Sequence, residues 1–214
     1  MLCRLSAWFI VCLCLGSPAA NAEIFQSEQA YFQSQILNND LSHPWSLVFL
    51  PNGDLLVSER AGRLKRLSAD GYLLAEIKGL PSIAAFGQGG LLDLALHPQF
   101  ESNQRLYFSF VQGSRLTGAN THLAYGRLVG NKLVDVKILF GAKPGSWGGR
   151  HFGGRIIFDD DGRLFLGLGD RGDRESAQDV TDHNGSVIML SDEGEVLPAP
   201  EGSISPTFPE IFSI

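Results

Sequence analysis

The sequence predicts an all-β fold, and three observations support this prediction. Apolar runs of about four to eight residues recur along the chain and are bounded by Gly, Pro, Asn and Asp. Apolar residues rarely recur at helical spacing, and glycine is abundant, with 25 in 214 residues. A plan of two apolar strands joined by a turn also occurs three times. Together these features predict short antiparallel strands connected by tight turns.

The first 22 residues are predicted to be a signal peptide. Arg4 supplies a positive start, residues 7–15 form an apolar core too short to span a bilayer, and Ala20-Asn21-Ala22 fits a cleavage site. A membrane anchor is the alternative, but polar sequence follows at once. We therefore expect a mature chain that starts at Glu23, lies in the periplasm or is secreted, and has no membrane span.

The mature chain, residues 23–214, is predicted to be a single β domain with recurring strands. The expected strands cover residues 45–50, 54–58, 64–67, 91–96, 106–111, 155–158, 164–168 and 187–190. Pro51-Asn52-Gly53 and Asp160-Asp161-Gly162 have the composition of hairpin turns, because glycine adopts a positive φ without steric cost.

The strands are arranged in a repeat. Three segments share the same plan, at residues 45–67, 91–110 and 154–170. Their second strands begin at Leu55, Leu106 and Leu164, which are 51 and 58 residues apart. Repeats of about 40–50 residues with roughly four strands each are typical of β-propeller blades. A β-sandwich would explain the strands but not their spacing, so we predict a propeller.

The length of the mature chain limits how much of a propeller it can form. About three blades fit into residues 23–214, whereas a closed propeller ring has about four blades or more. The last residues, Phe212-Ser213-Ile214, lie in a strand-like run. We therefore expect a partial propeller.

Charge and cysteine content exclude some classes of partner and stabilisation. The whole chain has a formal net charge of −6, and without Arg4 it has 16 basic and 23 acidic residues, a net charge of −7. This excess of acidic groups argues against a nucleic-acid partner. All three cysteines, Cys3, Cys12 and Cys14, lie in the predicted signal peptide. The mature protein is therefore expected to contain no disulfide.

The stretch around His151 carries the strongest candidate for catalysis. Gly148-Gly149 and Gly153-Gly154 flank His151, and we expect them to let backbone approach a flat or bulky ligand closely. A strand, a turn and a second strand then lead to Asp170. A neutral imidazole held by a carboxylate can take a proton from a hydroxyl group. The sequence therefore predicts His151 as a general base and Asp170 as its partner.

Gln88 is a candidate ligand-binding residue. It lies in Gly87-Gln88-Gly89-Gly90, just before an apolar strand. Its amide could hydrogen-bond a carbonyl or carboxylate of a ligand. The alternative is a plain polar loop residue, and the residues alone favour that alternative.

Other patterns are given structural interpretations. Residues 167–172 match GxGxxG, but no helical pattern follows, which argues against dinucleotide binding. Residues 159–162 are interpreted as a hairpin turn rather than a calcium loop. His97 is expected in a turn, and His122 and His183 in loops.

Three segments resemble the glucose/sorbosone dehydrogenase family. They are HPWSLVFLPNGDLLVSERAGRLKRL from His43, GQGGLLDLALHPQF from Gly87, and RHFGGRIIFDDDGRLFLGLGDRGD from Arg150 with the NGSVIML that follows. This family comprises periplasmic aldose sugar dehydrogenases that use pyrroloquinoline quinone (PQQ). The resemblance implies a six-bladed β-propeller, of which this chain would supply the N-terminal part.

The resemblance also implies roles for individual residues. His151 matches the base that removes the proton from the anomeric hydroxyl of the sugar and contacts PQQ, Asp170 matches its carboxylate partner, and Gln88 matches a PQQ-binding glutamine. The product would be a lactone. The family also uses Ca²⁺, whose ligands would lie outside this chain, as would an arginine that contacts the quinone.

Two alternatives to a sugar dehydrogenase remain open. One is a non-catalytic exported propeller fragment that binds a sugar or a protein. The other is an inactive truncated copy of the enzyme. The sequence does not identify the sugar, the electron acceptor or the oligomeric state.

Overall fold

The computed structural model of the protein describes residues 23–198 and 208–213. The predicted signal peptide, residues 1–22, lies outside the described residues. The chain divides into two units, Met1–Asn39 and Asp40–Ile214. The described part of the first unit contains one antiparallel hairpin, β1 (Glu23–Gln26) and β2 (Tyr31–Ser34).

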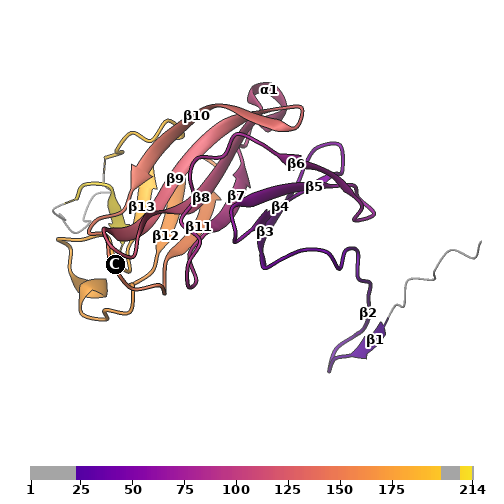
Figure 1. Cartoon of the computed structure of the whole chain (residues 1–214), viewed down its shortest axis with the longest axis horizontal. Helices are drawn as coiled ribbons and strands as arrows, with labels where there is room; N and C mark the ends of the chain where they lie inside the picture. Colours follow the sequence, from indigo (N-terminus) through magenta and orange to yellow (C-terminus); the bar gives the residue numbers. More distant parts are fainter. Residues whose placement is uncertain (1–22, 199–207, 214) are drawn as a thin grey trace, which may run out of the picture. The chain divides into compact units, whose positions relative to one another are not determined.

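The second unit contains three antiparallel sheets of four strands each, and every sheet keeps its strands in chain order (Figure 1). The first sheet consists of β3 (Pro44–Phe49), β4 (Leu55–Glu59), β5 (Arg63–Leu67) and β6 (Leu73–Ile77). The second consists of β7 (Leu91–Leu96), β8 (Arg105–Ser114), β9 (Gly118–Val129) and β10 (Lys132–Gly141). The third consists of β11 (Gly153–Phe158), β12 (Leu164–Leu168), β13 (Val187–Leu190) and β14 (Ile211–Ser213).

The sheets are joined in the manner of propeller blades. Strands β3 and β11 both contact β7, so the first strands of the three sheets lie together. The described residues contain two short helices, α1 (Phe100–Asn103) and a 3₁₀ turn at Ser176–Gln178. The protein is therefore an all-β chain with three blades of a β-propeller, which confirms the predicted fold class.

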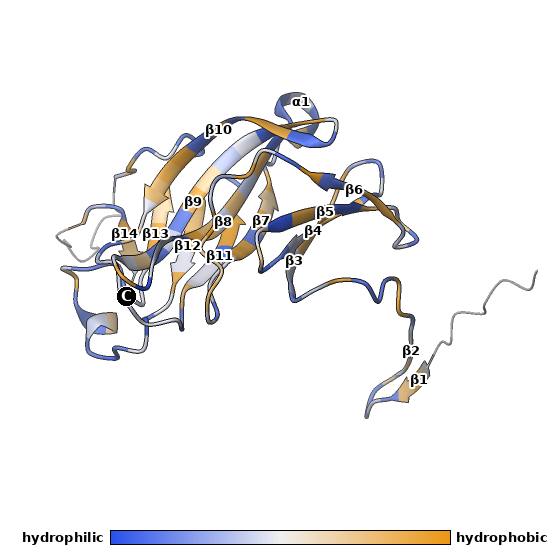
Figure 2. Ribbon diagram, viewed as in Figure 1, coloured by the Kyte–Doolittle hydropathy of each residue, from blue (hydrophilic) through white to orange (hydrophobic). Residues whose placement is uncertain are grey.

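Side chains that alternate along β8 contribute to two apolar clusters of the core, one on each face of the strand. Leu106, Phe108 and Phe110 belong to an apolar cluster shared with the first blade, whereas Tyr107 belongs to a cluster shared with the third blade. Because successive side chains of a strand point to opposite faces, a strand between two blades is apolar on both faces. Each buried Phe stabilises the fold by about 1.5–3 kcal/mol. Figure 2 shows hydrophobic residues concentrated in the strands and hydrophilic residues in the connecting loops.

All eight expected strands are present, and both expected hairpin turns are confirmed. Gly53 N donates to Leu50 O in the first turn, and Gly162 N donates to Asp159 O in the second. The prediction that His122 lies in a loop is wrong, because this residue lies within β9. Strand β9 has the sequence GANTHLAYGRLV, whose polar and small residues hide the apolar pattern of a strand.

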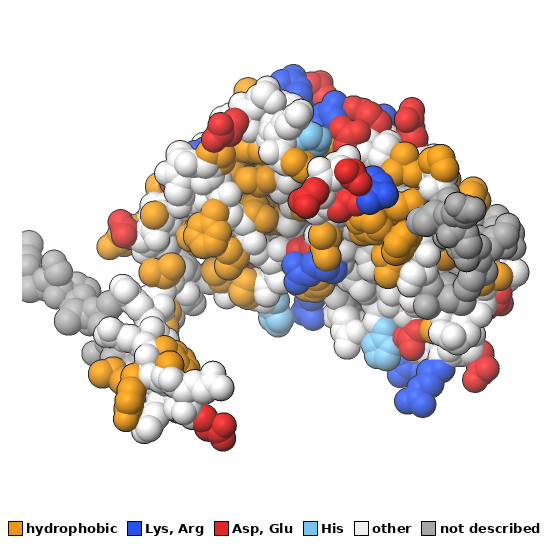
Figure 3. Space-filling model, turned by 180° about the vertical axis from the view of Figure 1, so that it is seen from behind, with side chains coloured by type: hydrophobic (Ala, Val, Ile, Leu, Met, Phe, Trp, Pro, Cys, Tyr) orange, Lys and Arg blue, Asp and Glu red, His pale blue; other side chains and the backbone are white. Residues whose placement is uncertain are grey.

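The surface of the larger unit is mixed in character. On the face shown in Figure 3, acidic and basic side chains are interspersed, with hydrophobic side chains exposed among them. No helix among the described residues is long and apolar enough to cross a membrane.

Candidate functional site

The structure brings His151 and Asp170 into direct contact. His151 Nδ1 and Asp170 Oδ1 are 2.7 Å apart, although the residues are 19 positions apart in the sequence. The cause is the β11–β12 hairpin, in which Gly153 pairs with Leu168. A residue just before β11 therefore lies beside a residue just after β12. The predicted base and its predicted partner are neighbours because an antiparallel hairpin separates them.

The hydrogen bonds of the pair determine the ionisation of Asp170 and place a proton on Nδ1 of His151. A hydrogen bond from Gly172 N, at 2.8 Å, and the hydrogen bond from His151 lower the pKa of Asp170 below its usual value. The carboxylate is therefore ionised at neutral pH and can only accept, so Nδ1 carries the proton. His151 Nε2 has no protein partner among the described residues, so in the neutral ring it is the nitrogen that can accept a proton. The side chain of His151 is 50% exposed and that of Asp170 is 26% exposed.

Close backbone contacts hold this pair together. A Cβ on Gly169 would lie 2.0 Å from the carbonyl oxygen of His151. His151 itself has a φ of 51°, in the left-handed region. The flanking glycine Gly153 likewise leaves no room for a side chain, because its Cβ would lie 2.6 Å from Gly167 O. Gly169 and Gly153 are therefore explained by contacts within the protein.

Gln88 contacts the loop that precedes β11 and contains Gly149 and His151. Its Oε1 accepts a hydrogen bond from His151 N at 2.7 Å, and its main-chain N donates to Gly149 O at 2.7 Å. The residue before it must be glycine, since a Cβ on Gly87 would lie 2.1 Å from Gly149 O. The amide Nε2 of Gln88 has no partner among the described residues. Gln88 thus positions His151 and also retains a donor for a ligand.

His151 and Gln88 border a cavity of about 620 Å³. The other residues that line it come from the first strands of two blades, from β12 and from the end of the His151 loop; they are Trp45, Phe152, Gly153, Arg155 and Gly167. The cavity therefore combines the predicted base with an aromatic side chain, an amide and a cation.

The cation is held by residues that sequence reasoning missed. Arg155 Nη1 donates to Asp93 Oδ1 at 3.0 Å, and the Arg155 guanidinium lies 5.3 Å from the ring centroid of Trp45. Asp93 is fully buried and also accepts from Ile156 N at 2.8 Å. Trp45, Asp93 and Arg155 belong to the first strands of three different blades. The available signal was Asp93 itself, a carboxylate within the apolar run LLDLAL.

The sequence as a whole matches one family of known proteins. Residues 41–214 match the family model described as glucose/sorbosone dehydrogenase. The chain belongs to the glucose/sorbosone dehydrogenase family. Among curated proteins, it is 36% identical over 196 residues to aldose sugar dehydrogenase YliI of Escherichia coli, covering 90% of this chain and 51% of that protein.

Solved structures of glucose/sorbosone dehydrogenases agree with this assignment. The soluble aldose sugar dehydrogenase of E. coli in its apo form superposes with a TM-score of 0.77 at 36% identity, covering 90% of this chain and 53% of that chain. A PQQ-bound aldose sugar dehydrogenase of Streptomyces coelicolor gives a TM-score of 0.70 at 29% identity, covering 92% and 55%. The chain spans about half the length of the relatives it matches. Three blades in half the length agree with a propeller of six blades.

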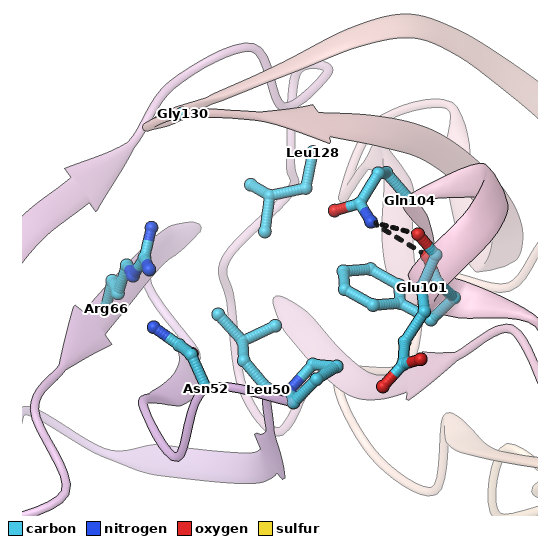
Figure 4. A pocket seen from close by; sticks show the side chains of 9 residues that line it. Leu50, Asn52, Arg66, Glu101, Gln104, Leu128 and Gly130 are labelled. Carbon is cyan, nitrogen blue, oxygen red and sulfur yellow. Dashed lines mark hydrogen bonds between the residues drawn. The ribbon is translucent and has the colours of Figure 1, made fainter.

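A second cavity lacks a candidate histidine base. It has a volume of about 320 Å³ and lies between the first two blades, beside the β3–β4 turn and α1 (Figure 4). Its polar groups satisfy one another locally: Gln104 Nε2 donates to the carbonyls of Phe100 and Glu101, and Arg66 pairs with Asp54. No histidine lines it. The cavity beside His151 is the candidate active site, because it is bordered by a histidine that is paired with a carboxylate and whose Nε2 has no partner among the described residues.

Within residues 23–198 and 208–213, no three His, Cys, Asp or Glu side chains converge on a common point.

Proposed function

We propose that the protein is a PQQ-dependent sugar dehydrogenase that oxidises the anomeric hydroxyl of an aldose and yields a lactone. The observation that carries this proposal is the His151–Asp170 pair, which lies beside a cavity of about 620 Å³. Nε2 of His151 has no partner among the described residues. Membership of the glucose/sorbosone dehydrogenase family and similarity to a PQQ-bound aldose sugar dehydrogenase support it.

The lining of the cavity suits a flat, anionic ligand such as PQQ. The guanidinium of Arg155 is held by a buried carboxylate and still has a side chain that is 62% exposed. Arg155 and the free Nε2 of Gln88 would bind carboxylate or carbonyl oxygens, and Trp45 offers an aromatic face. When bound, the cofactor supplies an acceptor for the hydride from the anomeric carbon.

The protein's own contribution is the movement of one proton. His151 Nε2 accepts the proton of the anomeric hydroxyl, and the ring becomes an imidazolium. Asp170 holds Nδ1–H throughout, which fixes the tautomer and stabilises the positive charge that forms. Positioned general bases typically contribute about 10²- to 10⁴-fold in rate.

The test is sugar-dependent dye reduction by the full-length protein after addition of PQQ and Ca²⁺. His151→Asn is compared with His43→Asn, because both histidines have φ near 50° and asparagine tolerates that conformation. We expect His151→Asn to lose about 10²- to 10⁴-fold in rate and His43→Asn to match the wild type. Equal rates for all three proteins would rule out His151 as the base.

The same assay separates the alternatives. A folded wild-type protein that binds PQQ or sugar without reducing the dye would favour a non-catalytic binding protein. We also propose export to the periplasm or the medium, on the basis of residues 1–22. N-terminal sequencing of the protein from its native source is expected to begin at Glu23, and an intact Met1 would exclude cleavage.

A further inference from the structure

Arg171 is a charged residue in an unusual environment. Only 8% of its surface is exposed, and no carboxylate among the described residues lies within ion-pair distance of it. Burial lowers the pKa of Arg171 to about 10, although the negative charge of Asp170 acts to raise it. The guanidinium is therefore still cationic at neutral pH. Burying a cation without an ion pair is costly unless other groups compensate.

Apart from the charge of Asp170, the compensation comes from the loop that carries His151, residues 148–152. Arg171 Nη1 donates to Arg150 O, and Nη2 donates to Gly148 O at 2.6 Å. The guanidinium carbon lies 3.3 Å from the ring centroid of Phe152. Nε is buried and has no acceptor in the described structure. Two carbonyls and one aromatic face of residues 148–152 therefore hold the charge.

These contacts alternate along the loop. Residues 148, 150 and 152 face Arg171, whereas the residues between them face Gln88. Gly149 O accepts from Gln88 N, and His151 N donates to Gln88 Oε1. The loop is thus held by Arg171 on one side and by Gln88 on the other.

Arg171 also acts on the other member of the pair through the chain itself. It directly follows Asp170 and has a φ of 56°, in the left-handed region. Its main-chain N donates to His151 O at 3.4 Å. Arg171 is therefore bonded covalently to Asp170, hydrogen-bonded to the carbonyls of Arg150 and His151, and stacked on Phe152, which follows His151.

We infer that Arg171 is a positioning residue that sets the distance between the His151 imidazole and the Asp170 carboxylate. It does not line the cavity, so it acts through the pair and not on a ligand. A planar guanidinium is required because two parallel donors and a stacking face are used at once. The effect on rate rests on the proposed function, but the effect on the His151 tautomer does not.

The test uses ¹⁵N-histidine NMR on the full-length protein, which reports the tautomer of His151 without any substrate. The wild type is expected to show a proton on Nδ1, hydrogen-bonded and slow to exchange. In Arg171→Met, which keeps the apolar stem, we expect this signal to be lost and the two tautomers to be averaged. Arg171→Lys keeps the charge with a single ammonium group and is expected to restore the signal only in part.

The kinetic readout distinguishes positioning from binding. Arg171→Met is expected to lower kcat by about 10- to 100-fold and to change KM by less than about two-fold. The control is Arg115→Met, which removes an exposed arginine stacked 5.2 Å from the neighbouring Phe86 ring. This control is expected to leave both readouts unchanged.

Two results would overturn the inference. One is an unchanged Nδ1–H signal in folded Arg171→Met. The other, if that variant does not fold, is full wild-type behaviour of Arg171→Lys. If the wild type shows the Nδ1–H signal but no sugar oxidation, the proposed function fails while the positioning role stands.

Discussion

Of the three histidine–carboxylate pairs in the described part of the chain, two lie in contrasting environments. His151–Asp170 lies beside the candidate cavity, with side chains 50% and 26% exposed. His183–Glu210 lies in the third blade, with side chains 2% and 15% exposed. The distances are similar, 2.7 Å and 3.1 Å. The pairs therefore differ in access to solvent and not in the type of contact.

The nitrogens of the buried ring are both occupied. His183 Nδ1 accepts from Lys143 N at 2.9 Å, so the proton lies on Nε2 and points to Glu210. The ring also lies against Phe208 and Phe140, at centroid distances of 4.2 Å and 5.1 Å. Burial lowers the pKa of His183, which keeps the ring neutral. The prediction that His183 is a loop residue missed this buried role.

The comparison shows that a histidine–carboxylate contact alone does not identify a base. A proton can be taken only where one ring nitrogen is unpaired and reachable. His151 meets this condition, because its Nε2 has no partner in the described structure and its ring is half exposed. His183 instead fixes the segments that contain Lys143 and Glu210.

Removing the carboxylate of the exposed pair is expected to give the largest effect. In Asp170→Asn the neutral amide can donate to Nδ1, which moves the ring proton to Nε2 and blocks the base. We expect kcat/KM to fall by about 10²- to 10⁴-fold, measured by dye reduction with PQQ. Glu210→Gln is the matched control and is expected to retain activity, since the new amide oxygen still accepts from His183 Nε2. Similar losses in both variants would contradict the comparison.

Removing the buried ring is expected to affect stability instead. His183→Ala deletes a packed ring and two hydrogen bonds, and we expect a loss of about 2–4 kcal/mol in the free energy of unfolding, measured with denaturant. His151→Asn is expected to unfold like the wild type. Activity of the folded His183→Ala protein is expected to persist, and its disappearance would show that the buried pair also serves the site.

The same variant gives a pH test with a defined sign. The pKa of His183 lies below its ordinary value of 6.5 in the folded protein, so the unfolded chain binds the proton first as the pH falls. The stability from neutral His183 is complete above about pH 6.5 and decreases below it. The wild type is therefore expected to lose more stability between pH 7 and 5 than His183→Ala. Burial also lowers the pKa of His122, but His122 is present in both proteins.

A pair of glycine substitutions on neighbouring positions tests how the exposed pair is held, with a smaller expected effect. Gly169→Ala places a Cβ 2.0 Å from His151 O, so backbone must move and separate His151 from Asp170. We expect a loss of about 1–3 kcal/mol in stability. Gly167→Ala meets no atom within 4 Å and is expected to change stability by less than about 0.5 kcal/mol. Equal melting temperatures for the two variants would refute the close approach at Gly169.

The sequence by itself determined the fold class and the closest contact of the site. Strands at the interfaces between blades are apolar on both faces, so their runs are visible without a structure. His151 and Asp170 were predictable as a pair because only one hairpin separates them, and a hairpin brings its two ends together. By contrast, β1, β2, β6, β9 and β10 were missed, since strands with exposed or polar positions lack a continuous apolar run.

Only the tertiary structure decided the surroundings of that pair. Gln88 meets His151 across 63 residues, and Asp93 meets Arg155 across 62. These contacts depend on how one blade is placed against the next, which no local spacing records. The burial of Arg171 has the same origin. The sequence around Arg171 would look the same in an exposed loop, and its side chain is buried because the loop at residues 148–152 presents two carbonyls to it.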